Sequence, residues 1–173
     1  MHDFRYVGKK LFCEGVAVET LAKKFGTPLY VYSQKTLTAH FQKLDSALAP
    51  LDHLICFAMK ANSNLSVLRT IANLGGGFDI VSGGELQRVI AAGGDPRKCV
   101  FAGVGKTEAE IEFALRQNIF SFNAESEPEL RRISTFATAP FFNSTTASHP
   151  LSLIRRPRNS RRLGLWPTKS AES

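Results

Sequence analysis

Residues 53–64 read HLICFAMKANSN, and this stretch decides how the chain can fold. The six apolar residues 54–59 run without a charge and stop at Lys60, which small and amide residues follow. A short apolar run rich in Ile and Phe, ended by turn-forming residues, is typical of a strand buried on both faces. The stretch therefore predicts a buried strand with Lys60 at its carboxyl end.

Lys60 would then occupy the position at which open α/β sheets and barrels carry their chemistry. Burial disfavours the charged form of a lysine, and a neutral amine attacks carbonyl compounds. Lys60 is therefore a candidate for a lysine that condenses with an aldehyde cofactor. A solvated lysine that only closes a strand is the alternative interpretation of this pattern.

Strand–helix units follow this strand at regular intervals. The predicted strands end near Lys60, Ser82, Gly103 and Asn123, which gives one unit every 20–22 residues. Three of the helices are expected to begin with a capping box, in which a hydroxyl residue and a glutamate three positions later satisfy free backbone N–H groups. These pairs are Ser82 with Glu85, Thr107 with Glu110, and Ser126 with Glu129.

Units of this kind give parallel strands with helices outside them. Their regular spacing favours an α/β fold of the (β/α)8 TIM-like barrel type over a doubly wound sheet. Residues 29–32 predict an earlier strand, and with four further units the chain falls short of the eight that a closed barrel needs. We expect residues 1–133 to form a partial barrel, truncated after about half of its units.

Two patterns precede the barrel units. Residues 4–13 predict two short strands around a turn that contains glycine, and residues 16–25 predict a helix. Ser33 is a good N-cap for the helix that leads into the Lys60 strand.

Residues 134–173 break the pattern. Ser and Thr supply 12 of these 40 residues, and Pro supplies four. The segment holds six Lys and Arg against one acidic residue, whereas residues 1–133 hold 16 against 14, so most of the net charge of +7 lies there. We expect a basic, disordered tail. The alternatives are an arm that binds nucleic acid or a membrane surface, and a change of reading frame near Ile133.

The composition narrows the class of protein further. Cys13, Cys56 and Cys99 are odd in number and widely spaced, which indicates reduced thiols in a cytoplasmic protein. We expect no signal peptide, no membrane span, no nucleic-acid partner and no metal site. Residues 103–107, GVGKT, lack the earlier glycine of a phosphate-binding P-loop, so Lys106 and Thr107 are interpreted as a loop residue and an N-cap.

Three blocks of sequence together carry a family resemblance: FAMKAN at 57–62, GFDIVSGGE at 77–85 and FAGVGKT at 101–107. They resemble the amino-terminal half of diaminopimelate decarboxylases, which belong to the barrel-fold, pyridoxal-phosphate-dependent decarboxylases of ornithine, diaminopimelate and arginine. The opening GTPLYVY at 26–32 fits the same pattern. The resemblance covers roughly residues 4–133.

The resemblance implies site residues. Lys60 matches the lysine that holds pyridoxal phosphate covalently, and Asp79 and Glu85 match acidic positions near the cofactor. The implied reaction converts meso-2,6-diaminopimelate to L-lysine and carbon dioxide, and the intact enzyme would be a homodimer acting on a small amino acid. The family's phosphate-binding loop, the acid that faces the cofactor nitrogen and the carboxy-terminal β domain have no counterpart in residues 134–173.

The resemblance therefore implies a fragment that is inactive, or nearly so, on its own. Three alternatives stay open at this point. The chain could act on ornithine or arginine, it could bind pyridoxal phosphate without catalysis, or it could be a non-enzymatic module whose basic tail binds nucleic acid.

Overall fold

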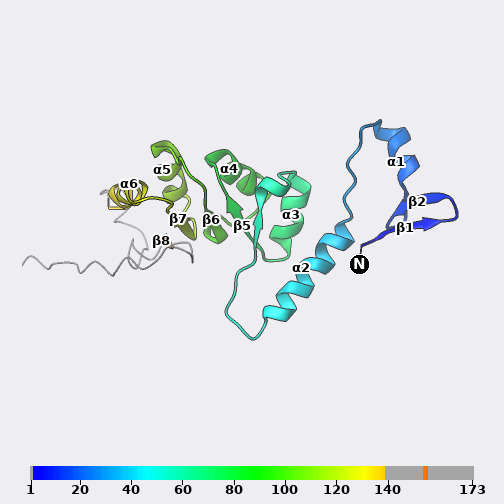
Figure 1. Cartoon of the computed structure of the whole chain (residues 1–173), viewed down its shortest axis with the longest axis horizontal. Helices are drawn as coiled ribbons and strands as arrows, with labels where there is room; N and C mark the ends of the chain where they lie inside the picture. Colours follow the sequence, from blue (N-terminus) through cyan, green and yellow to red (C-terminus); the bar gives the residue numbers. More distant parts are fainter. Residues whose placement is uncertain (1, 139–153, 156–173) are drawn as a thin grey trace, which may run out of the picture.

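The computed structural model describes residues 2–138 and 154–155. These residues form a three-stranded antiparallel sheet, β1-β2-β3, and a five-stranded parallel sheet in the order β4-β5-β6-β7-β8 (Figure 1). The elements, in chain order, are β1 (Phe4–Val7), β2 (Lys10–Cys13), β3 (Val16–Ala17), α1 (Val18–Phe25), α2 (Gln34–Leu48), β4 (Cys56–Ala58), the 3-10 turn η1 (Met59–Ala61), α3 (Leu65–Asn73), β5 (Gly77–Ile80), α4 (Gly83–Ala91), the 3-10 turn η2 (Pro96–Lys98), β6 (Cys99–Phe101), α5 (Glu108–Arg116), β7 (Ser121–Asn123), α6 (Glu127–Ala137) and β8 (Ile154–Arg155).

The amino-terminal sheet lies at one end of the molecule, and α2 connects it to the parallel sheet (Figure 1). The predicted strand pair over residues 4–13 and the N-cap at Ser33 are both confirmed. The carboxylate of Glu14 accepts hydrogen bonds from the Ser33 hydroxyl, at 2.8 Å, and from the Lys35 backbone N–H, at 2.9 Å. These bonds fix the start of α2 against the antiparallel sheet.

The predicted strand at residues 29–32 is wrong. This segment belongs to no sheet among the described residues, although Tyr30 and Tyr32 are exposed while Leu29 and Val31 are half-buried. A sequence pattern typical of a strand predicts alternating burial, which this segment shows. A strand also needs the edge of a neighbouring strand with which to form hydrogen bonds. Among the described residues, no strand pairs with this segment.

The four predicted strand–helix units are confirmed from β4 to α6, and they succeed one another across the molecule (Figure 1). The strands pair in sequence order, and parallel connections are almost always right-handed, so the helices lie on one face of the sheet. The core forms on that face, where Phe78, Ile80, Phe101 and Phe122 pack into one cluster with residues of all four helices. Each of these four strand side chains is fully buried.

The opposite face of the sheet is made of smaller and more polar side chains. Ala58, Asp79, Val100 and Ser121 are register partners on adjacent strands, one position out of phase with the phenylalanines. The first three are only half-buried. The prediction of a strand buried on both faces at residues 54–59 is therefore wrong, because helices from these units cover one face only. The strand itself is shorter than predicted, at Cys56–Ala58.

All three predicted N-caps are confirmed, since the hydroxyls of Ser82, Thr107 and Ser126 accept the expected backbone N–H groups. Only the α5 pair is a full capping box. The Glu85 and Glu129 carboxylates instead accept from the residue before the cap, Val81 and Glu125, each at 2.7 Å. A glutamate at the third helical position thus fixes the turn that leads into each of these helices.

Helix α6 continues to Ala137, four residues beyond the predicted boundary at residue 133. The prediction of a disordered or frame-shifted tail concerns mainly residues 139–153 and 156–173, which lie outside the described residues, so it stays a prediction. Within the described part of the chain, no helix is long and apolar enough to cross a membrane. Burial raises the pKa of the Cys99 thiol to about 12, and all three cysteines are free.

Lys106 lies in the loop after β6, as predicted, but it is buried. Its ammonium group donates to the backbone oxygens of Gly103, at 2.6 Å, and Asn123, at 2.9 Å, and lies 3.1 Å from the Glu129 carboxylate. The Lys106 side chain is 1% exposed and that of Glu129 is 8% exposed. This buried ion pair joins the third strand–helix unit to the fourth at the carboxyl end of the strands.

Replacing Lys106 with Met should lower the free energy of unfolding by about 3–5 kcal/mol, because the Glu129 carboxylate would stay buried without its cation. Urea unfolding followed by circular dichroism measures the change. Arg116→Gln is the matched control, since it breaks only an exposed pair with Glu112 and should cost less than about 0.5 kcal/mol. Equal effects of the two substitutions would contradict the assignment of a buried ion pair.

Gly77 supplies a second test of the sheet. A Cβ atom added there would lie 2.2 Å from the Lys98 backbone oxygen and 3.0 Å from the Cys56 sulfur. Gly77→Ala should therefore push β5 away from its neighbours and destabilise the fold by about 2–3 kcal/mol. Gly15→Ala, which would meet no atom within 4 Å, should change the unfolding midpoint little in the same urea experiment. A tolerated alanine at position 77 would show that the strands pair differently.

Candidate functional site

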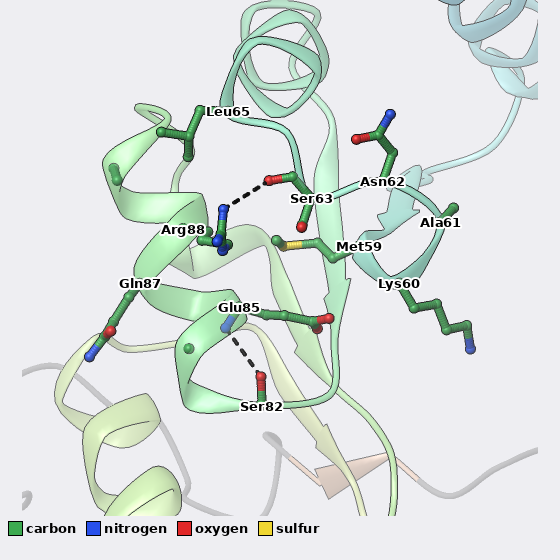
Figure 2. A pocket seen from close by; sticks show the side chains of 12 residues that line it. Met59, Lys60, Ala61, Asn62, Ser63, Leu65, Ser82, Glu85, Gln87 and Arg88 are labelled. Atoms are coloured by element: carbon green, nitrogen blue, oxygen red, sulfur yellow. Dashed lines mark hydrogen bonds between the residues drawn. The ribbon is translucent and has the colours of Figure 1, made fainter. Parts of the chain in front are cut away.

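Lys60 lies in η1, the single turn that follows β4 directly. The structure thus confirms that Lys60 stands at the carboxyl end of a strand. The predicted burial of Lys60 is wrong, because its side chain is exposed where no helix of these units covers the sheet. Figure 2 shows this side chain pointing away from α4.

Hydrogen bonds hold the turn that carries Lys60. Met59, the residue before it, is 1% exposed and belongs to the core cluster. The Asn62 N–H donates to the Met59 oxygen at 3.1 Å, and the Asn62 side chain accepts the Asn64 N–H at 2.9 Å. Asn64 in turn caps α3 by accepting the Ser66 N–H at 2.9 Å. The sequence after the lysine therefore fixes its backbone position while leaving its amine accessible.

Asp79 lies on β5. Its register partner on the neighbouring strand β4 is Ala58, which comes two residues before Lys60. Its side chain is half-buried, and its neighbours in sequence, Phe78 and Ile80, are buried on the helix side. Together with burial, which is the larger cause, the charge of Asp79 raises the pKa of the Cys56 thiol. No hydrogen bond or ion pair joins Asp79 to Lys60 in the described part of the chain. Asp79 lies on β5, and Lys60 lies in the turn that follows the neighbouring strand β4.

Glu85 lies on the first turn of α4, where its carboxylate accepts the Val81 N–H at 2.7 Å. This bond accounts for the residue as part of the turn between β5 and α4. Glu85 also lines a cleft between η1 and α4, together with Lys60, Ser63, Ser82 and Arg88. A contact between Glu85 and a cofactor stays a prediction.

The cleft has a volume of about 930 Å³ and includes residues that sequence reasoning missed. The guanidinium of Arg88 donates to the Ser63 backbone oxygen at 3.4 Å and reaches across the cleft from α4 (Figure 2). Arg88 lies three residues after Glu85, so both residues face the same side of the helix. That spacing is the signal that could have identified it.

The arrangement suits covalent attachment of an aldehyde cofactor. A reactive amine must be accessible and held in place, and Lys60 meets both conditions. The role of the Asp79 carboxylate at the attachment point stays a prediction. Arg88 and the hydroxyls of Ser63 and Ser82 are further donors in the lining of the cleft.

Comparisons with known proteins identify the family. Residues 34–154 match the model of the pyridoxal-dependent decarboxylase, pyridoxal binding domain. A diaminopimelate decarboxylase of Vibrio cholerae is 59% identical over 128 residues, which are 74% of this chain and 31% of that protein.

Solved structures agree with this assignment. A diaminopimelate decarboxylase from M. jannaschii aligns with a TM-score of 0.74 at 35% identity, over 78% of this chain and 32% of that one. The Helicobacter pylori enzyme, complexed with L-lysine, aligns with a TM-score of 0.66 at 45% identity, over 69% and 30%. The chain spans about one third of the length of these relatives. The accessible lysine at the strand end, the parallel units and the matches together show that the chain belongs to the pyridoxal-dependent decarboxylases, whose cofactor is pyridoxal phosphate.

Proposed function

We propose that this chain supplies the cofactor-attaching part of a diaminopimelate decarboxylase, which converts meso-2,6-diaminopimelate to L-lysine and carbon dioxide in lysine biosynthesis. The observation that carries the proposal is Lys60, held on a hydrogen-bonded turn after β4 in a chain 59% identical to such an enzyme. Diaminopimelate is favoured over arginine as the substrate, because the arginine decarboxylase of Paramecium bursaria Chlorella virus is only 27% identical to this chain.

The residues of the chain would divide the work. Pyridoxal phosphate, when bound, supplies an electron sink for the electron pair that loss of carbon dioxide leaves behind. Lys60 would hold the cofactor covalently through its amine. Asp79, on the adjacent strand, would stabilise positive charge at that nitrogen. Glu85 would hold the turn between β5 and α4 through Val81 and would contact the cofactor from there.

We further propose that the intact enzyme is a cytoplasmic homodimer. The free thiols of Cys13, Cys56 and Cys99 support a reducing compartment. The half-buried side chains on the uncovered face of the sheet support the expectation that further strands and helices of a barrel close the site in the intact enzyme.

The attachment residue can be tested directly. The chain is incubated with pyridoxal phosphate, reduced with borohydride and mapped by peptide mass spectrometry. We expect Lys60 to carry more label than exposed lysines away from the cleft, such as Lys9 and Lys43, because Lys60 is held on a hydrogen-bonded turn beside β5, where Asp79 would stabilise the charged nitrogen of the attached cofactor. Lys60→Arg should remove that label, and Lys43→Arg should leave it unchanged. Equal labelling of all exposed lysines would overturn the role given to Lys60.

The chain alone should decarboxylate diaminopimelate at least about a thousandfold more slowly than the Vibrio cholerae relative. Lys60 is open to water on the uncovered face, so neither the orientation of the cofactor nor the exclusion of water is provided. Release of carbon dioxide from labelled substrate measures the rate. Turnover close to that of the relative would show that these residues form a complete site.

A further inference from the structure

Among the arginines of the described residues, some are paired with carboxylates and others, Arg88 included, are not. Arg97, Arg116 and Arg131 each form an ion pair with a carboxylate within one helical turn. Arg88 has no carboxylate within ion-pair distance among residues 2–138, and its one hydrogen bond, to the Ser63 oxygen, is 3.4 Å long. Its charge is therefore not compensated by the described part of the chain.

The cleft beside Arg88 offers further donors. The Ser63 hydroxyl and the Gln87 amide make no hydrogen bond within the described residues, and both line the cleft. The Ser82 hydroxyl accepts the Glu85 N–H, at 3.2 Å, and keeps its own proton to donate. The Glu85 carboxylate is the one acidic group in the lining, but it binds the Val81 N–H and points away from Arg88 (Figure 2).

Besides Lys60 and Asn62, the rest of the lining is apolar. Leu65, which is 39% exposed, lines the cleft together with Met59 and Ala91. Gly84 leaves the floor open, since a Cβ there would meet only the Ser82 hydroxyl oxygen, at 3.9 Å. A cleft of about 930 Å³ has the size of sites that bind small organic molecules.

We propose that the cleft between η1 and α4 binds a small organic anion, whose oxyanion group is held by the Arg88 guanidinium and whose hydrocarbon part packs on Leu65. A guanidinium presents paired N–H donors that match a carboxylate or a phosphate. The site goes beyond the proposed cofactor attachment, because the Lys60 side chain lies on the rim and points away from Arg88 (Figure 2).

The test uses the whole chain, labelled with 15N, titrated separately with inorganic phosphate and with glutarate, a dicarboxylate. We expect saturable shifts of the Gly84 and Ser63 amide signals with both anions. Glutarate should bind more tightly, because its methylene groups contact Leu65; the reverse order would assign the site to phosphate alone and overturn the apolar part of the proposal. Shifts that do not saturate, or that avoid these residues, would overturn the proposal entirely.

Two variants and a control make the result specific. Arg88→Gln should weaken glutarate binding by about tenfold or more, because charged hydrogen bonds are lost. Arg69→Gln, which alters an exposed arginine of α3 outside the cleft, should bind as the unaltered chain does. If Arg88→Gln fails to fold, Arg88→Lys decides: it keeps the charge but loses the paired donors, so unchanged affinity would refute the role of the guanidinium.

Discussion

The handedness of the connections between parallel strands is the constraint on which the rest of this structure depends. The strands of the parallel sheet pair in sequence order, and connections of this kind are almost always right-handed, which places the helices between them on one face of the sheet. That face receives Phe78, Phe101 and Phe122 and forms the dry core. The other face keeps small and polar side chains, of which Ala58, Asp79 and Val100 are only partly covered, as in half of a barrel. Lys60 is exposed for this reason, and the same exposure makes its amine accessible.

The units are joined to one another by buried or half-buried carboxylates at the carboxyl end of the sheet. Glu110 of α5 accepts the Gly83 N–H of the preceding unit at 2.9 Å, and Glu129 of α6 binds Lys106 of the unit before it. Each of these two glutamates therefore stabilises the start of its own helix and also binds the preceding strand–helix unit. Because the site lies at the same end, these contacts also fix the loops around the cleft. A cofactor site at this edge would benefit from such rigid connections.

The sequence was sufficient for the periodic features and insufficient for the tertiary ones. The strand–helix units, the caps at Ser82, Thr107 and Ser126, and the place of Lys60 at a strand end all follow from local patterns. Burial of Lys60 could not be predicted, because it depends on what covers the far face of the sheet. The strand expected at residues 29–32 failed for lack of a pairing edge. Lys106 and Arg88 were missed as important residues because their partners, Glu129 and Ser63, are 23 and 25 residues away.

The strand–helix units fold into a one-sided parallel sheet and thereby hold Lys60 on a fixed turn. Amide hydrogen exchange in the native chain tests this arrangement most directly. We expect strong protection at Phe78, Ile80 and Phe101, which lie in strands paired on both sides, and weaker protection in β4, which is paired with β5 alone within the described residues. Exchange in β5 and β6 as fast as in the urea-unfolded chain would contradict it.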